Sequence, residues 1–307
     1  MARTDNLNNF LTDVATAIKD KKGDTSPISA SNFDTEITNL PSGGGDISEY
    51  FDENIDGGSI KGSGWTNTVL KTPAYKFNGT NADYMFYAYP LPTIDLTNID
   101  TSNTTSMIHM FQYSKIQSID IAKLVVNKVT NASVLFSGCE NIKEINMDNM
   151  DFASCTDFGY MFNGAKITDI SMKNVNMSKV KNLNCFIQNT NVKNLDMTNC
   201  DMSSVNSLNS FACASLTNLI FGLNLGKNYT RTSTNYSSYK LQLNACVNLT
   251  HDSLMSVINN LYDLNLIYDV ANGGTLYTQS LLIGSKNVAK LTTEEIAIAT
   301  NKGWTVS

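Results

Sequence analysis

The sequence is short of the residues on which most catalytic and metal sites depend. Only two of its 307 residues are histidines, His109 and His251, so neither a Ser-His-Asp nor a Cys-His arrangement has support. Its six cysteines form no C-x-x-C pair, and a zinc site would need that spacing and more histidines. We therefore expect no catalytic residue, no metal, no cofactor and no enzyme activity.

Charge and long apolar runs are also scarce. Charged residues make up 16% of the chain, against about 25% in typical soluble proteins, and the formal net charge is −6. This negative charge makes a nucleic-acid partner or an anionic membrane surface unexpected. No run of 18 apolar residues is present, so membrane insertion is not expected either. Asn, Thr and Ser supply the polarity instead, which fits extracellular or virion proteins.

What the chain does contain is a repeat. An aliphatic landmark recurs at spacings of 24 to 26 residues, and a phenylalanine recurs with the same drifting period. The aliphatic landmark is Ile94, Ile119, Ile145, Ile170, Leu195 and Leu219, and the aromatic one is Phe86, Phe111, Phe136, Phe162, Phe186 and Phe211. A period of this length is typical of solenoids, in which each coil covers the apolar face of its neighbour.

The aliphatic landmark opens a triplet that alternates apolar, polar and apolar residues. In Ile145-Asn146-Met147, this alternation predicts a strand with the outer pair buried and the middle residue in solvent. Leu219-Ile220-Phe221 has no polar middle residue, which indicates that the regular repeat ends there. We expect the phenylalanines to fill the far side of each coil. The cysteines are interpreted as reduced, buried thiols that act as small apolar residues.

One copy of the repeat carries a family resemblance. Residues 96–107 read Leu-Thr-Asn-Ile-Asp-Thr-Ser-Asn-Thr-Thr-Ser-Met, and Met110-Phe111 follows. This phrase resembles the repeat of the BspA-like leucine-rich-repeat surface proteins, with looser copies over about 69–221. We therefore expect an α/β repeat protein: a leucine-rich-repeat solenoid of coils of about 25 residues, with short parallel strands plus turns or short helices, capped at both ends and preceded by a small helical segment.

Residues 1–44 have a different pattern. Apolar residues at helical spacing predict two short helices that cannot bury their apolar stripes alone. The stretches 10–15, Phe-Leu-Thr-Asp-Val-Ala, and 21–23, Lys-Lys-Gly, resemble the N-terminal segment of tail and tail-fibre-type proteins of phages and prophages. That resemblance implies a virion-attachment or oligomerisation role for Leu7, Phe10, Leu11, Val14, Ile18, Phe33 and Ile37.

The chain is accordingly divided into five parts. These are a helical attachment segment (1–40), a Gly-rich linker (41–46), an N-terminal cap (47–68), the solenoid (69–221), and an insertion loop with a C-terminal cap (222–307). In the last part we predict strands at 241–243 and 281–284, and a helix over 254–264 with Asp252 as its N-cap. A final helix starting at Leu291 should be followed by Trp304, packed on the last coil.

Two surfaces are candidates for ligand recognition. The first, in the insertion after the repeats, offers aromatic and basic side chains: Tyr229, Arg231, Tyr236 and Tyr239. The second is the outward strand face, with Asp95, Asp120, Asn146, Ser171 and Asp196, and with Glu144 and Asp169 one position before the landmark. Sugars would suit either surface. The acidic face could also bind a cation, or supply the two carboxyls, about 5–10 Å apart, of a glycosidase.

These inferences lead to a non-enzymatic virion protein of a tailed phage or prophage, a tail fibre or other tail or head appendage, that displays its repeats for host recognition. Its expected partners are other virion proteins, bound through the N-terminal segment, further copies of itself (a trimer as a first guess) and a host cell-surface glycan or protein. The alternatives are a BspA-like adhesin on the bacterial cell surface and a carbohydrate-active enzyme.

Overall fold

The computed structural model describes residues 79–94, 96, 99–208, 211–227, 240–266 and 279–307. All of them lie in one compact unit, Ser48–Ser307. The predicted N-terminal helices, the joint after them, the N-terminal cap and the start of the first coil fall outside the described residues. The same holds for Asp95, Tyr229, Arg231, Tyr236 and Tyr239.

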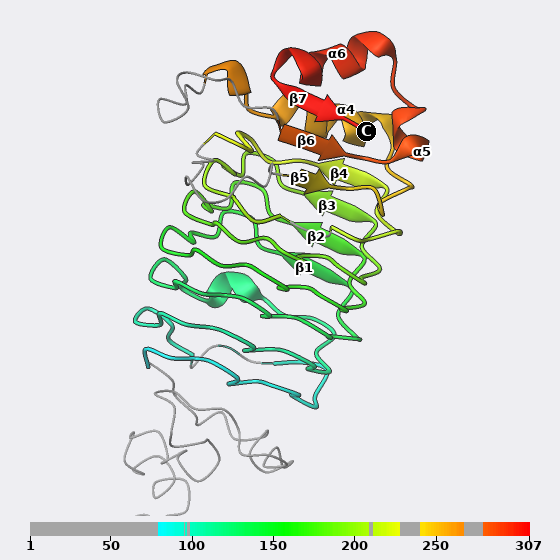
Figure 1. The fold of residues 1–307 in the computed structure, drawn as a ribbon. Coiled ribbons are helices and arrows are strands. Elements are labelled where there is room, and N and C mark those ends of the chain that lie inside the picture. Colours follow the sequence, from blue (N-terminus) through cyan, green and yellow to red (C-terminus); the bar gives the residue numbers. More distant parts are fainter. Residues whose placement is uncertain (1–78, 95, 97–98, 209–210, 228–239, 267–278) are drawn as a thin grey trace, which may run out of the picture. The chain divides into compact units, whose positions relative to one another are not determined.

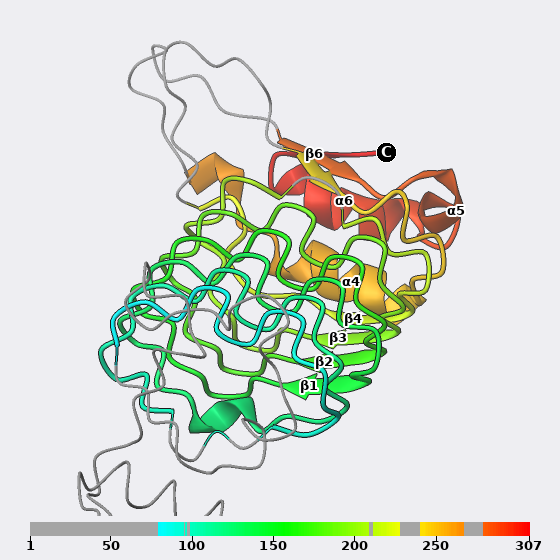
Figure 2. The same ribbon diagram turned by 90° about the horizontal axis from the view of Figure 1, so that it is seen from below.

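The described part is a mixed α/β, repeat-like fold with parallel strands, as the sequence predicts. Its first sheet has four three-residue strands in the order β1 (Glu144–Asn146), β2 (Asp169–Ser171), β3 (Asn194–Asp196) and β4 (Asn218–Ile220). Figure 1 shows these strands one above another along one side of the repeats, and Figure 2 shows successive repeats following similar paths. The aliphatic landmarks are in register, because Ile145, Ile170, Leu195 and Leu219 are strand partners.

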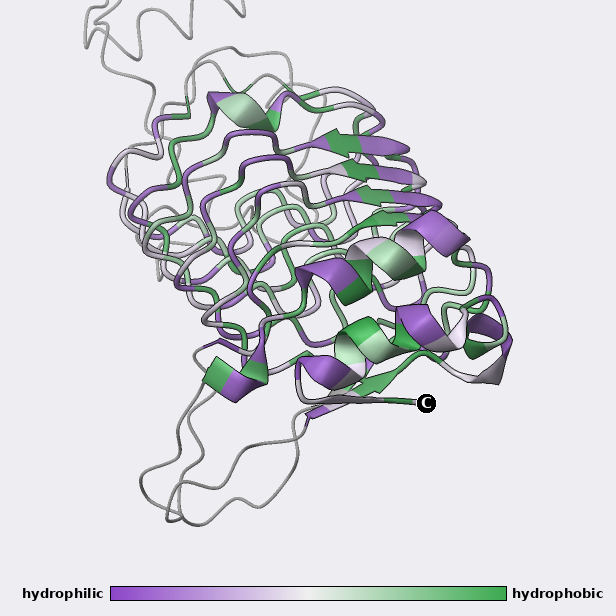
Figure 3. Cartoon of the chain, turned by 90° about the horizontal axis from the view of Figure 1, so that it is seen from above, coloured by the Kyte–Doolittle hydropathy of each residue, from purple (hydrophilic) through white to green (hydrophobic). Residues whose placement is uncertain are grey.

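Each observed strand begins one residue before the predicted triplet, so the aliphatic landmark is its middle residue. This middle residue is buried, and the two flanking residues point outward. Figure 3 shows the resulting band of hydrophobic residues along the middle of the strands. The expected alternation is confirmed where Ile145 and Met147 are buried and Asn146 is exposed. No strand forms at Ile119, however, because only Thr93 and Ser118 bridge there and Ile121 begins the 3-10 helix η2 (Ile121–Lys123).

The first sheet ends at β4, the strand that contains Leu219, where the triplet pattern predicts that the regular repeat ends. Strand β4 pairs in register with β3, and Ile220 takes the outward position opposite Asp196 with 46% of its surface exposed. The next turn continues the pattern, since Asp201 bridges Leu223 and Leu225 bridges Leu261. The ladder persists because its backbone hydrogen bonds do not depend on a polar side chain at the outward position.

The phenylalanine column forms the interior of the repeats, as predicted. All six of these rings are fully buried. Neighbouring ring centroids lie 5.1 to 6.0 Å apart along the column. Most neighbours stack, whereas Phe162 and Phe186 meet edge to face at 83°. Because every inner ring touches the ring of the repeat before and after it, the core is continuous from one repeat to the next.

Left-handed backbone also recurs with the repeat. Residues at one turn position all have φ between 55° and 63°, although none is a glycine: Tyr84, His109, Val134, Tyr160 and Cys185. A second such row consists of Asn149, Asn174, Asn199 and Asn224. In that row Asn174 donates a hydrogen bond to Asn149, and Asn199 donates one to Asn174, at 3.0 and 2.8 Å. Such hydrogen bonds between repeats offset the cost of the left-handed conformation.

The C-terminal region has its own parallel sheet, in the order β5 (Lys240–Gln242), β6 (Gln279–Leu282) and β7 (Trp304–Val306). Its helices are α4 (His251–Asn260), η3 (Leu264–Leu266), α5 (Ser285–Val288) and α6 (Thr293–Asn301). The two predicted strands and the two predicted helices are present. Trp304 is buried, and its indole N–H donates to the carbonyl of Tyr262 at 2.9 Å.

The predicted cap and length of α4 need correction. The N-cap is Thr250, whose hydroxyl accepts from the Ser253 amide, and Asp252 lies in the first turn instead. Threonine and aspartate are both good N-cap residues, and both side chains favour the positive helix terminus, so composition alone does not separate them. Helix α4 also ends at Asn260, and Leu264 belongs to η3. Over the described ranges, no helix has the length and apolar character needed to cross a membrane.

Candidate functional site

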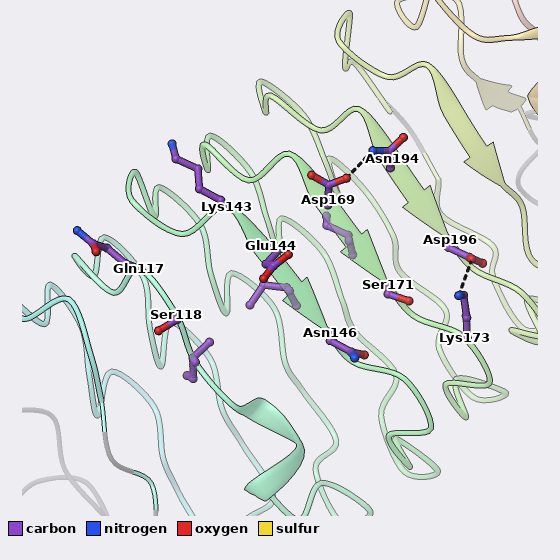
Figure 4. Close-up of a pocket in the computed structure, with 13 residues that line it drawn as sticks. Gln117, Ser118, Lys143, Glu144, Asn146, Asp169, Ser171, Lys173, Asn194 and Asp196 are labelled. Atoms are coloured by element: carbon purple, nitrogen blue, oxygen red, sulfur yellow. Dashed lines mark hydrogen bonds and ion pairs between the residues drawn. The ribbon is translucent and has the colours of Figure 1, made fainter.

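Residues of the first sheet and of the repeat before it line a groove with a volume of about 560 Å³. Figure 4 shows that these side chains come from successive repeats and lie in rows across the strands. The lining consists of Gln117, Ser118, Ile119, Lys143, Glu144, Ile145, Asn146, Asp169, Ile170, Ser171, Lys173, Asn194 and Asp196. We call this surface the strand-face groove.

One row across the sheet contains Glu144, Asp169, Asn194 and Asn218, which are partners in the parallel ladder, and the first three of them line the groove. The Asn194 amide donates to Asp169, and the Asn218 amide donates to Asn194 at 2.6 Å. The Thr168 hydroxyl also donates to Asp169, at 2.6 Å. These bonds, from Thr168 first and then from Asn194, lower the pKa of Asp169. Asp169 is therefore held as a carboxylate at neutral pH.

The second row contains Asn146, Ser171 and Asp196, which are also ladder partners. Ser171 donates to a carboxylate oxygen of Asp148 at 2.6 Å. Asp196 accepts from both the amide and the hydroxyl of Thr198, at 2.9 and 2.5 Å, and forms an ion pair with Lys173 at 3.4 Å. Each of these contacts fixes a polar atom before any ligand arrives.

The structure brings together three of the five residues predicted for the outward face: Asn146, Ser171 and Asp196. Asp120 is exposed, but it precedes η2 and does not line the groove. The sequence reasoning missed Lys143, Lys173 and Asn194. Asn194 was detectable, because it occupies the same repeat phase as Glu144 and Asp169. Lys143 was also detectable, because Lys193 occupies the same repeat phase, whereas lysine does not recur at the position of Lys173.

The groove offers closely spaced hydrogen-bond donors and acceptors together with mixed charge. Three carboxylates (Glu144, Asp169 and Asp196) and two ammonium groups (Lys143 and Lys173) line it, and Lys173 pairs with Asp196. A glycosidase acid needs a raised pKa, whereas the pKa of Asp169 is lowered. Within the described residues, no group of three or more His, Cys, Asp or Glu side chains is placed to hold a metal ion. The arrangement suits binding of a polar ligand.

Both histidines lie outside the groove lining. His109 is half-buried, stacks on Tyr84 with ring centroids 4.5 Å apart, and contacts the side-chain oxygen of Gln112. His251 is exposed and bonds to Glu295 at 2.8 Å, which links α4 to α6. Glu295, through its hydrogen bond and its charge, raises the pKa of His251. Each histidine therefore has a structural partner.

The cysteines are free thiols, as predicted, and five of the six are buried, with Cys185 only half-buried. Burial raises the pKa of Cys139 to about 11, and raises the pKa values of Cys155, Cys200 and Cys246 to about 12. These four side chains remain protonated at neutral pH and behave as small apolar residues of the core.

Fold and groove together describe a repeat-like protein with parallel strands and a groove along its strand face. Comparison with known families adds one finding. Residues 113–219 match a family described as "Mycoplasma protein of unknown function, DUF285". The matched segment contains β1 to β3 and therefore most of the groove lining, and it lies inside the region that resembles BspA-like repeats. No curated protein and no solved structure matches the chain.

Proposed function

We propose that this chain is a non-enzymatic adhesion protein of the BspA-like kind, displayed on a bacterial cell surface. In this proposal the repeats form a leucine-rich-repeat solenoid that presents the strand-face groove to a ligand on another surface. The single observation that carries the proposal is the groove itself. Its side chains come from neighbouring repeats held in strict register, and they lie within the segment that matches the DUF285 family.

The groove is organised for binding because its polar groups are already oriented. The Asp169–Asn194 and Lys173–Asp196 contacts in Figure 4 hold acceptors and donors in place across strands. Preorganisation lowers the cost of ordering side chains when a ligand binds. Glu144 and Lys143 are both exposed beside these fixed pairs and are available for charge-assisted hydrogen bonds to a host glycan or protein. Several copies on one surface would add avidity to weak single contacts.

A virion appendage remains the second candidate, and the resemblance of residues 1–44 to phage tail proteins is what favours it. No family match falls on those residues, and the matched repeats favour the cell-surface adhesin. Immunogold labelling with an antibody against the full chain separates the two. Gold on the surface of the producing cells supports the adhesin, whereas gold confined to released phage particles supports the appendage.

Binding by the groove is tested with the full chain on immobilised fibronectin, fibrinogen, laminin and mucin. We expect saturable binding to at least one of these, with a loss of at least about tenfold in Glu144→Trp, because the indole would fill the groove. The matched control is Asn127→Trp, at an exposed turn outside the groove lining, which should bind as the unmodified chain does.

Two results would overturn the proposal. The first is equal binding by Glu144→Trp and the unmodified chain. The second is polysaccharide hydrolysis by the unmodified chain that is lost in Asp120→Asn or Asp169→Asn, because this would make the protein a carbohydrate-active enzyme.

A further inference from the structure

A cluster of exposed tyrosines lies on residues separate from the strand-face groove. Tyr84, Tyr87 and Tyr113 are 37%, 39% and 50% exposed, and none of them lines the groove. Tyr87 lies between the other two, with ring centroids 5.8 Å from Tyr84 and 5.7 Å from Tyr113. His109 stacks on Tyr84 and extends the aromatic surface. We call these four residues the tyrosine cluster.

The backbone holds the cluster rigidly. The amides of Tyr84 and Tyr113 donate to the carbonyls of Ile108 and Ser137 in the next repeat, at 3.0 and 2.9 Å. Both tyrosines have φ of 59°, a left-handed conformation that costs free energy for a residue with a Cβ. A Cβ on Gly138 would come within 2.3 Å of the Tyr113 ring, so that ring lies directly on the glycine. The left-handed backbone at Tyr84 and Tyr113, together with the absence of a side chain at Gly138, therefore fixes these rings at the surface.

Three properties of the cluster restrict what it can bind. Full burial of an aromatic side chain covers about 150–250 Å², so the exposed parts of three tyrosines amount to roughly 250 Å². A stable protein partner needs about 800 Å², so the area suits a few sugar rings better than a second copy of the chain. Furthermore, the cluster offers aromatic faces and phenol hydroxyls as its contacts, which favours a neutral ligand. The C–H groups of a pyranose face can lie against an aromatic ring while its hydroxyls bond to phenol oxygens.

We propose that the tyrosine cluster is a second binding site, for a neutral oligosaccharide that stacks on Tyr87 and its two neighbours. This site does not depend on the strand-face groove or on the proposed adhesion function. Tyr87 is the central ring and, unlike Tyr84 and Tyr113, it is not in the left-handed conformation. It can therefore be substituted without disturbing a strained turn.

The test is binding of the full chain to an array of immobilised neutral, sialylated and sulfated oligosaccharides. We expect binding to at least one neutral oligosaccharide, weakened about tenfold in Tyr87→Ala and within about threefold of the original in Tyr87→Phe, which keeps the ring. Tyr160→Ala is the matched control. Tyr160 occupies the same left-handed repeat position as Tyr84 and is 47% exposed, but its ring is outside the cluster.

The results distinguish glycan binding at the tyrosine cluster from binding in the strand-face groove. Loss of glycan binding in Tyr87→Ala but not in Glu144→Trp or Tyr160→Ala supports the site. Failure to bind any neutral oligosaccharide would overturn it, as would binding that Tyr87→Ala leaves unchanged. Self-association of the chain that disappears in Tyr87→Ala, measured by analytical ultracentrifugation, would also overturn it, because the cluster would then be a contact between copies.

Discussion

The repeats and the C-terminal region bury apolar surface in different ways. In the repeats, the same residue type lies over itself from one coil to the next, as in the buried column through Phe111, Phe136 and Phe162. In the C-terminal region, helices with individual caps carry the packing, and α6 has a complete capping box between Thr292 and Glu295. The comparison shows that the repeats are stabilised by stacking on one another, whereas the C-terminal region contains the helix that covers the edge of their last strand.

Helix α4 ends the first sheet by replacing the missing neighbour of β4. The amides of Leu219 and Phe221, which would otherwise bond to a fifth strand, donate to the hydroxyls of Ser253 and Ser256 at 2.8 and 2.9 Å. The Asn260 amide donates in turn to the carbonyl of Phe221 at 2.7 Å. Side chains of one helix thus satisfy the strand edge that would otherwise invite pairing with another chain.

The largest expected effect comes from breaking the phenylalanine column at its centre. Phe136→Ala removes a fully buried ring that stacks on Phe111 at 5.1 Å and on Phe162 at 5.8 Å. We expect the free energy of unfolding to fall by about 3–5 kcal/mol, measured by urea denaturation followed by circular dichroism. Phe136→Leu fills more of the space and should cost less. A loss below about 1 kcal/mol for the alanine variant would contradict a continuous column.

A smaller effect is expected from the helix that ends the sheet. Ser253→Ala leaves the buried Leu219 amide without its acceptor and the Thr217 carbonyl without one donor. The expected loss is about 1–3 kcal/mol in the same denaturation experiment. Ser215→Ala, at a half-exposed turn, is the control and should stay within about 0.5 kcal/mol of the unmodified chain. Equal losses in the two variants would show that α4 does not complete β4.

The smallest effect concerns the pairing of His251 with Glu295. Glu295 raises the pKa of His251 above 6.5. The stabilisation of the folded state by protonated His251 is therefore full below pH 6.5 and is lost as the pH rises through the raised pKa. The pKa of Glu295 is lowered below 4.5, mainly by the hydrogen bond from the Thr292 backbone amide. The stabilisation of the folded state by ionised Glu295 is therefore present above pH 4.5 and is lost as the pH falls through the lowered pKa.

Both charges are therefore present between pH 4.5 and 6.5. Scanning calorimetry should show a small deficit in the Tm of His251→Gln at about pH 5.5 that shrinks by about pH 8. A deficit that grows as the pH rises would contradict the pairing. The deficit should also shrink when Glu295→Gln is the background, because Asp252, 3.6 Å from the His251 ring, is then its remaining acidic partner.

The repeats could be predicted from the sequence alone, because two independent landmarks share one period. That period predicts the buried phenylalanines, the register of Ile145 with Ile170, and the outward position shared by Asn146, Ser171 and Asp196. The last strand, β4, differs from the others because its outward position opposite Asp196 has no polar residue. The backbone ladder tolerates Ile220 there.

Other features were beyond sequence reasoning for physical reasons. The left-handed turn at Tyr84 leaves no compositional trace, because tyrosine is not a residue that normally marks positive φ. The tyrosine cluster depends on that turn. Likewise, Lys173 reaches Asp196 only because the two residues lie in neighbouring repeats, 23 positions apart in the chain. Pairs of this kind are not visible within any single repeat, and the side-chain conformations that bring them into contact are set by the folded structure.

Cross-linking across β1 and β2 tests most directly whether the groove is a single surface built from neighbouring repeats. Glu144 and Asp169 are ladder partners, so their Cα atoms should lie roughly 4.8 Å apart, within the range a disulfide can span. The account predicts that Glu144→Cys/Asp169→Cys forms this disulfide on mild oxidation, mapped by mass spectrometry, while the diagonal pair Glu144→Cys/Ser171→Cys, roughly 8 Å apart, does not. Efficient cross-linking of the diagonal pair, with none of the direct pair, would contradict the register on which the groove depends.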